Sequence, residues 1–189
     1  SIGHSLYDLL AQNVGWVLLS GVLQMERYPR YKEKIIIRTW ISSYKSIRGF
    51  RENIIYDEAY NIIGRAKGLW VFYDIKKRRP TKLWDVFKEK WPACNEHSID
   101  YDITTKIEAI DDAEITKEFK VNLYDTDTNK HVNNIRYLQW LMESLPENII
   151  DDYYLDSIDG RFITEAQYGD NIITSTKSDV EENSFIHTI

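Results

Sequence analysis

The chain contains an internal repeat, and this repeat constrains the fold more than any other feature. Residues Tyr31–Thr39 read YKEKIIIRT, and residues Tyr168–Thr176 read YGDNIITST. Each segment places an aromatic and an acidic residue before a run of β-branched side chains, which is typical of a turn leading into a strand. A repeat at constant spacing predicts two related units in one chain. The first repeat lacks a counterpart of residues 118–134, and the second ends before a counterpart of residues 53–73. We therefore expect the first unit to be incomplete at its start and the second at its end.

Hydrophobic periodicity predicts a chain dominated by strands, with a few helices. The first half is predicted to form an opening helix, four strands and a short helix, at 5–13, 15–25, 34–44, 50–56, 62–73 and 81–91. The second half is predicted to form a strand, a helix and two further strands, at 118–124, 132–146, 158–167 and 171–182. Four long strands in succession indicate antiparallel pairing.

Polar side chains that are common in catalysis occupy every second position just before the predicted helix at 132–146. These residues are Asp125, Asp127, Asn129 and His131. Alternation with a period of two would place them on one face of an extended segment. Any one of them alone is more often a turn or cap residue than a catalyst, so the prediction depends on the joint pattern.

The same segment leads into a helix N-terminus. The first backbone N–H groups of a helix lack intrahelical partners, and the helix dipole favours negative charge there. We therefore predict an oxyanion site at the amides of Val132, Asn133 and Asn134.

Several short stretches of the sequence are similar to one enzyme family. The most specific is DTNKHVNN at Asp127–Asn134, followed by Tyr137, Trp140 and Glu143. Shorter matches include Arg27-Tyr-Pro29, Thr39-Trp-Ile41, Gly49-Phe-Arg51 and Arg78-Arg-Pro80. With these stretches, nearly the whole chain resembles the acyl-acyl carrier protein thioesterases of bacteria and plant plastids.

The resemblance implies an α+β fold of the tandem (double) hot-dog type, with antiparallel sheets each wrapped around a long helix. Two such units normally share one continuous sheet, so we expect one compact molecule. The predicted domains are an N-terminal hot-dog repeat with a short closing helix at 1–91, a linker at 92–117, and a C-terminal catalytic repeat at 118–189.

The resemblance also implies a catalytic group, which consists of Asp127, Asn129, His131 and Glu165. It predicts hydrolysis of fatty acyl-acyl carrier protein thioesters to free fatty acid, without a cofactor. In our assignment Glu165, alone or with His131, activates water, Asn129 positions the water or the thioester, and Asp127 fixes the motif by hydrogen bonds. Plant members carry a cysteine directly after the glutamate, where this chain has Ala166. A cysteine nucleophile is therefore impossible at this position, which favours direct attack by water.

The repeat spacing predicts a different role for the first unit. It matches Glu165 to Tyr28, so the first unit cannot perform the same chemistry. We expect it to line an acyl tunnel with apolar residues, namely Trp16, Leu18, Leu23 and Trp70. Each buried methylene of the acyl chain contributes about 0.8 kcal/mol, which suffices to discriminate chain lengths.

A dense basic run stands out from an otherwise acidic chain of net charge −6. It comprises Lys76, Lys77, Arg78 and Arg79, and a second basic group comprises Lys45, Arg48 and Arg51. The net charge argues against nonspecific nucleic-acid binding. The run is either a solvated loop or a dock for an acidic acyl carrier protein, whose attraction would raise the association rate.

Other functional classes find little support in the sequence. The single cysteine, Cys94, excludes an intrachain disulfide and is expected to be inert. We predict no metal, because no Cys/His cluster has ligand spacing. No segment reaches the roughly 20 apolar residues of a membrane span, so a soluble, cytoplasmic protein is expected. A homodimer, hydrolysis of coenzyme A thioesters and a non-catalytic acyl-binding role remain open alternatives.

Overall fold

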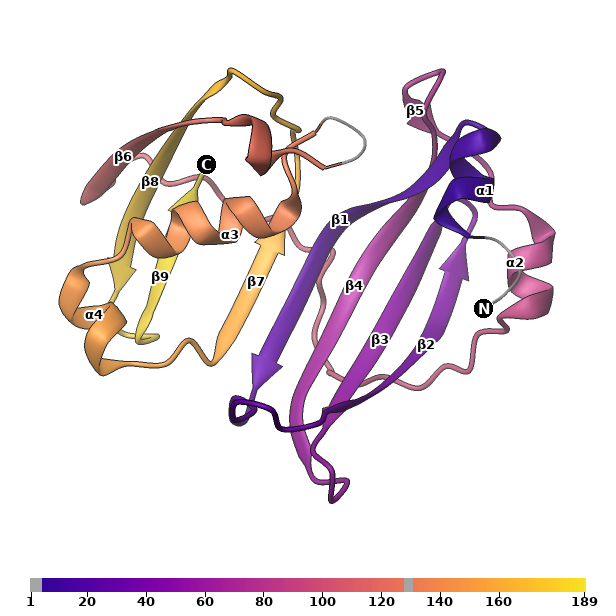
Figure 1. Ribbon diagram of the computed structural model, residues 1–189, viewed down its shortest axis with the longest axis horizontal. Helices are drawn as coiled ribbons and strands as arrows, with labels where there is room; N and C mark the ends of the chain where they lie inside the picture. Colours follow the sequence, from indigo (N-terminus) through magenta and orange to yellow (C-terminus); the bar gives the residue numbers. More distant parts are fainter. Residues whose placement is uncertain (1–4, 128–130) are drawn as a thin grey trace. The chain divides into compact units, whose positions relative to one another are not determined.

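The computed structural model describes residues 5–127 and 131–189, which form two compact units (Figure 1). The first unit contains the residues up to Lys106 together with Leu155–Phe162. The second contains Ile107–Tyr154 and Ile163–Ile189. The chain therefore returns to the first unit for one short segment before it completes the second.

A six-stranded antiparallel sheet forms most of the first unit. Its strands are β1 (Val14–Met25), β2 (Ile36–Lys45), β3 (Arg48–Tyr56), β4 (Ile62–Asp74), β5 (Arg79–Pro80) and β7 (Ser157–Arg161). They follow the order β2-β3-β4-β1-β7, with β5 paired to the end of β4. The four strands predicted in the first half are confirmed within about two residues. The strand predicted at 158–167 is shorter, and it pairs with β1 of the first unit.

A β-bulge in β1 determines which side chains share a face of this sheet. The pairing of β1 with β4 shifts between Leu18 and Ser20. Residues paired across strands lie on the same face, so Leu18 opposite Trp70 and Leu23 opposite Ala66 belong to one face of β4. Without the extra residue, Leu18 and Leu23 would point to opposite faces. The bulge thus brings the predicted tunnel residues of β1 together.

Two helices pack on one end of this face. They are α1 (Leu6–Ala11) and α2 (Asp85–Lys90). Phe87 from α2 and Phe72 from β4 are buried together, and their ring centroids are 5.4 Å apart. Trp16 packs against both rings. The side chain of Trp16 is therefore part of this apolar cluster.

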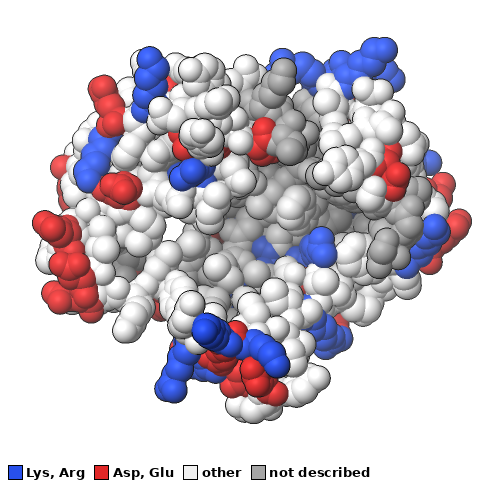
Figure 2. Space-filling view, viewed as in Figure 1, with Lys and Arg blue, Asp and Glu red and all other residues white. Residues whose placement is uncertain are grey.

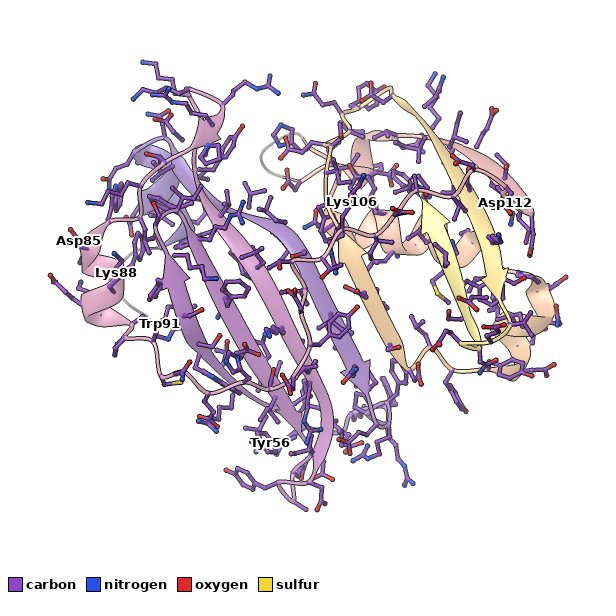
Figure 3. All side chains as sticks on the ribbon, turned by 180° about the vertical axis from the view of Figure 1, so that it is seen from behind. Tyr56, Asp85, Lys88, Trp91, Lys106 and Asp112 are labelled. Atoms are coloured by element: carbon purple, nitrogen blue, oxygen red, sulfur yellow. The ribbon has the colours of Figure 1, made fainter. Side chains whose placement is uncertain are left out.

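The opposite face of the sheet is covered by an extended segment, Cys94–Thr105, which we call the strap. Figure 3 shows the chain crossing the sheet between the labelled residues Trp91 and Lys106. Ile99 and Ile103 of the strap are buried against Val22 and Leu69. The fully buried carboxylate of Glu52 accepts hydrogen bonds from the strap at the Ser98 amide and hydroxyl (3.1 and 2.7 Å). The predicted linker is thus an integral part of the first unit over this length.

The second unit combines a three-stranded sheet with two helices. Its elements are β6 (Ile115–Lys120), a short 3-10 turn η1 (Leu123–Asp125), α3 (Asn134–Glu143), α4 (Glu147–Asp152), β8 (Asn171–Asp179) and β9 (Ser184–Thr188). The strand order is β6-β8-β9. Trp140 of α3 is buried with Val121, Val132 and Ile172. The sequence analysis did not predict α4 or β9, because both are short and weakly periodic.

The two sheets are separate, so the expectation of one continuous sheet in one compact unit was wrong. β7, which comes from the second half of the sequence, pairs with β1 in the sheet of the first unit. Among residues 5–127 and 131–189, no helix has the length and apolar character that crossing a membrane requires.

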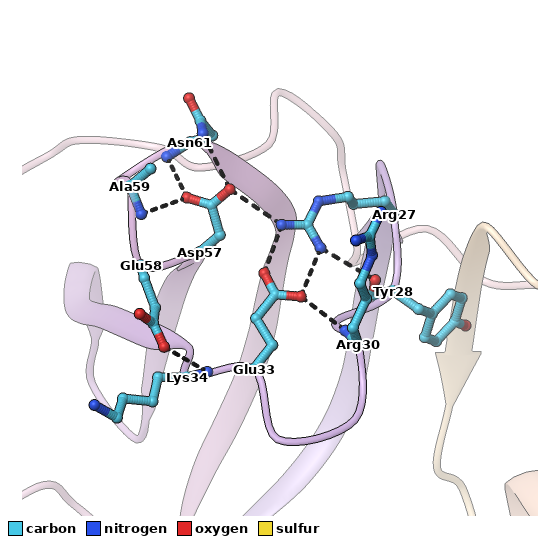
Figure 4. A network of polar contacts seen from close by, with 9 residues as sticks. All are labelled: Arg27, Tyr28, Arg30, Glu33, Lys34, Asp57, Glu58, Ala59 and Asn61. Carbon is cyan, nitrogen blue, oxygen red and sulfur yellow. Dashed lines mark hydrogen bonds and ion pairs between the residues drawn. The ribbon is translucent and has the colours of Figure 1, made fainter.

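The internal repeat is reproduced in the local structure of both units. In the first unit the Arg30 amide donates to the Glu33 carboxylate (2.7 Å), and the Glu33 amide donates to the Arg30 carbonyl (2.9 Å). In the second unit Gln167 and Asp170 make the same two bonds, at 2.8 and 3.1 Å. Figure 4 shows the first of these turns, in which Glu33 also pairs with Arg27. The repeated acidic residue therefore stabilises an equivalent turn before each strand.

Candidate active site

The described residues of the motif that precedes α3 pair with each other in the second unit. The Asp127 amide donates to the His131 carbonyl (2.8 Å), and the His131 amide lies 3.3 Å from the Asp127 Oδ1 acceptor. A single β-bridge joins Thr126 to Val132 on the next rung. Asp127 therefore contacts the backbone at His131 through both its amide and its carboxylate. The predicted catalytic residue Asn129 lies outside the described residues.

His131 and Val132 lie beside the segment that carries Glu165. A second β-bridge joins His131 to Gln167, and the Val132 amide donates to the Ala166 carbonyl (2.9 Å). As a result, Nδ1 of His131 lies 3.5 Å from Oε2 of Glu165. Both side chains are partly exposed, at 34% and 51% respectively. Two predicted residues that are far apart in sequence are therefore brought together at the surface.

Asp125 does not share a face with Asp127 and His131, so the predicted alternation was wrong at this position. Asp125 is the last residue of η1 and is buried. Its carboxylate accepts a hydrogen bond from the Asn122 amide (2.7 Å). Its carboxylate also pairs with Arg136 of α3 (3.2 Å). Asp125 is a structural residue that connects η1 to α3.

The predicted oxyanion site is largely occupied by the protein itself. The amide of Val132 donates to Ala166, and the amide of Asn133 donates to the Asp125 carbonyl (2.9 Å). Asn133 is the N-cap of α3, so the helix begins two residues later than predicted. This assignment is therefore corrected for Val132 and Asn133, whose amides serve the fold. Asn134, the first residue of α3, keeps its predicted role as a hypothesis.

Tyr137 is a residue at the site that the sequence analysis did not assign. Its hydroxyl oxygen accepts a hydrogen bond from the Ala166 amide (2.9 Å), directly after Glu165. Burial raises the pKa of the Tyr137 hydroxyl, the nearby Glu165 and Asp170 carboxylates raise it further, and the Ala166 amide opposes the rise. The hydroxyl therefore stays neutral at ordinary pH. In the sequence, only the family motif drew attention to Tyr137, and nothing there indicated its contact with Ala166.

The basic run covers the turn between β4 and β5 and continues into the first residue of β5. Its four residues, Lys76, Lys77, Arg78 and Arg79, are all exposed. Figure 2 shows basic side chains gathered at the top of the view over this turn. Lys77 is partly neutralised, because its amide and ammonium group both contact Asp74 (2.8 and 3.5 Å). No group of three or more potential metal ligands occurs within the described ranges.

Comparison with known proteins identifies the family. The acyl-ACP thioesterase N-terminal domain matches residues 2–91, and the C-terminal domain of the same family matches residues 108–189. The chain therefore belongs to the acyl-ACP thioesterase family. An oleoyl-acyl carrier protein thioesterase from Coriandrum sativum is 29% identical over 186 residues, which is 92% of this chain and 50% of the relative. The chain thus spans about half the length of the curated relatives it matches.

Solved structures confirm the predicted hot-dog fold class. A protein from Lactobacillus plantarum, assigned as an oleoyl thioesterase, is 26% identical with a TM-score of 0.83, and covers 100% of this chain and 76% of its own. A 12:0-ACP thioesterase from Umbellularia californica is 21% identical with a TM-score of 0.80, over 94% of this chain and 70% of its own.

Proposed function

We propose that this protein hydrolyses fatty acyl-acyl carrier protein thioesters to free fatty acid and carrier protein. The family membership supports the reaction class. The observation that carries the proposal at this site is the approach of His131 to Glu165, at 3.5 Å, with the backbone of His131 bonded to Asp127. A carboxylate and an imidazole in contact provide a general base with a partner that can share the proton.

In the proposed reaction, water is the nucleophile. Glu165, assisted by His131, removes a proton from water as the water oxygen bonds to the thioester carbon. The carbonyl electron pair moves to oxygen, and the Asn134 amide at the start of α3 is our remaining candidate to stabilise that charge. When the tetrahedral intermediate collapses, the carbon–sulfur bond breaks and the proton passes to the leaving thiolate. Because Ala166 cannot act as a nucleophile, no acyl-enzyme intermediate is needed.

The substrate assay separates this proposal from its alternatives. Relatives are named for oleoyl, palmitoyl and 12:0 acyl groups, so the panel should cover these three chains, each on carrier protein and on coenzyme A. We expect release of free fatty acid with a higher kcat/KM on carrier protein. Equal or better turnover of the coenzyme A esters would indicate a coenzyme A thioesterase, and binding without turnover would indicate an acyl-binding module.

Replacing Glu165 tests the catalytic assignment. Glu165→Gln should lower kcat by at least ~10²-fold, the usual scale for a positioned base, while the circular dichroism spectrum and melting temperature are preserved. The matched control is Glu181→Gln, an exposed glutamate elsewhere in the second unit. Near-normal turnover of Glu165→Gln would show that water is activated by another group.

We further propose that the basic turn between β4 and β5 docks the carrier protein, and that Leu18, Leu23 and Trp70 contact the acyl chain. The exposure of Lys76, Lys77, Arg78 and Arg79 on one turn supports the first role. The shared apolar face of β1 and β4 supports the second. Trp16 remains a candidate for this face, although its ring also packs in the core.

A further inference from the structure

The segment that carries Glu165 has little packing of its own. Residues 162–166 form neither helix nor strand, and Ile163 is 81% exposed. Segments with few buried contacts open easily on their own. A catalytic carboxylate on such a segment needs an external support if it is to stay in one position.

Tyr137 provides a support of this kind from a rigid element. It lies on α3, half-buried, with its ring edge-on to the buried Trp140 at 5.7 Å between centroids. Its hydroxyl accepts the hydrogen bond from the Ala166 amide, which belongs to the peptide unit that directly follows the α-carbon of Glu165. The Ala166 carbonyl is held from the other side by the Val132 amide. The two bonds fix the backbone on the C-terminal side of Glu165 relative to both α3 and His131.

We propose that Tyr137 is a positioning residue that holds Glu165 against His131. This inference rests on the proposed function, because it names what keeps the proposed base in place. Tyr137 acts through the Ala166 amide and need not touch the substrate. Its effect is expected on the chemical step, since a displacement of about 1 Å can cost up to ~10²-fold in rate.

The test compares two tyrosines with similar surroundings. Tyr44 is also half-buried, and its hydroxyl donates to the Trp91 carbonyl (3.0 Å) in the first unit. Tyr137→Phe removes the hydroxyl that accepts from the Ala166 amide, and Tyr44→Phe removes the hydroxyl that donates to the Trp91 carbonyl. We expect Tyr137→Phe to lower kcat by about 10- to 100-fold with KM changed less than about twofold, and Tyr44→Phe to leave both unchanged. A normal kcat in Tyr137→Phe would overturn the proposal.

A double-mutant cycle shows whether Tyr137 acts through Glu165. If it does, adding Tyr137→Phe to Glu165→Gln should lower kcat no further than Glu165→Gln alone. If the two effects multiply, Tyr137 acts independently and the proposal is wrong.

Nuclear magnetic resonance provides a readout that does not require activity. In Tyr137→Phe the Ala166 amide should exchange faster with solvent, and the His131 ring signals should shift toward those of Glu165→Gln. Unchanged His131 signals would overturn the positioning role even if no substrate is turned over. If the protein hydrolyses no thioester but shows both spectral changes, the proposed function is refuted while the positioning of Glu165 by Tyr137 is supported. If Tyr137→Phe is much less stable than Tyr44→Phe, the exchange measurement is made below its unfolding transition.

Discussion

Gly68 illustrates how a single residue shapes the apolar face of the first sheet. A β-carbon at this position would lie 2.9 Å from Nε1 of Trp70 and 3.3 Å from Cδ1 of Leu18. The indole of Trp70 therefore folds over the backbone of Gly68 beside Leu18, its partner across the strands. Both side chains are among those proposed to contact the acyl chain, so the glycine sets the space available to them.

Adding a methyl group at Gly68 should destabilise the first unit. We expect Gly68→Ala to lower the free energy of unfolding by ~1–3 kcal/mol, the usual cost of overpacking, because the rigid indole must move. Chemical denaturation measures the change. Gly160→Ala is the control, since a β-carbon there meets nothing within 4 Å and alanine is favoured over glycine in a strand. Equal stability of both variants would mean that Trp70 moves aside freely.

The turn between β1 and β2 shows how the repeat works at the scale of an element. Arg27 donates to Glu33 (2.6 Å) and to Asp57 (3.0 Å), which links this turn to the one after β3 (Figure 4). The hydrogen bond from Arg27, followed by the one from the Arg30 amide, lowers the pKa of Glu33 to about 2. In the equivalent turn of the second unit, the Asp170 carboxylate accepts the corresponding hydrogen bond from the Gln167 amide.

This lowered pKa predicts a dependence of stability on acid. Glu33 binds its proton less readily in the folded state, so its contribution is complete above the ordinary value of 4.5 and is lost as pH falls toward about 2. Glu33→Gln should therefore be less stable than wild type near pH 6, and the difference should shrink steadily below pH ~4.5. Urea denaturation at several pH values measures it. Glu89→Gln, at an exposed position of α2, is the control. A difference that does not depend on pH would contradict the role of the charge.

At the scale of the whole molecule, the distribution of charge matters more than its sum. The chain carries a net charge of −6, yet four consecutive basic residues are exposed on the turn between β4 and β5 and at the start of β5. A local basic surface on an acidic protein can attract an acidic partner to one place and repel it elsewhere. This contrast is the basis of the docking proposal.

Charge reversal with varied salt tests the dock. Lys76→Glu with Arg78→Glu should lower kcat/KM for acyl carrier protein substrates, and the loss should shrink between ~0.05 and ~0.5 M salt as the screening length falls from roughly 14 to 4 Å. Small thioesters should react normally. Reversal of Lys88 and Lys90 on α2 makes the same change of charge away from the turn. Equal losses on both kinds of substrate would show that the turn is structural, and Lys45, Arg48 and Arg51 would be tested next.

Patterns between near neighbours in the sequence were enough to predict the long strands of the first unit and the helix at α3. Alternation and turn residues located the four long strands, because each reflects one buried face and a local break. The repeat was also visible, since Glu33 and Asp170 stabilise equivalent turns with partners three residues away. The motif at Asp127 to His131, together with Glu165, pointed to the family and to the candidate site.

Contacts between distant segments required the tertiary structure. The bulge after Leu18 reverses the facing of the rest of β1, and strand propensity carries no sign of it. β7 pairs with the first sheet, although its place in the sequence suggested the second unit. The amides of Val132 and Asn133 donate to the carbonyls of Ala166 and Asp125, which are not their neighbours in the sequence. The Tyr137 hydroxyl accepts from the amide of Ala166, 29 positions away. Such bonds depend on where the backbone passes in space, because any amide can donate and any carbonyl can accept.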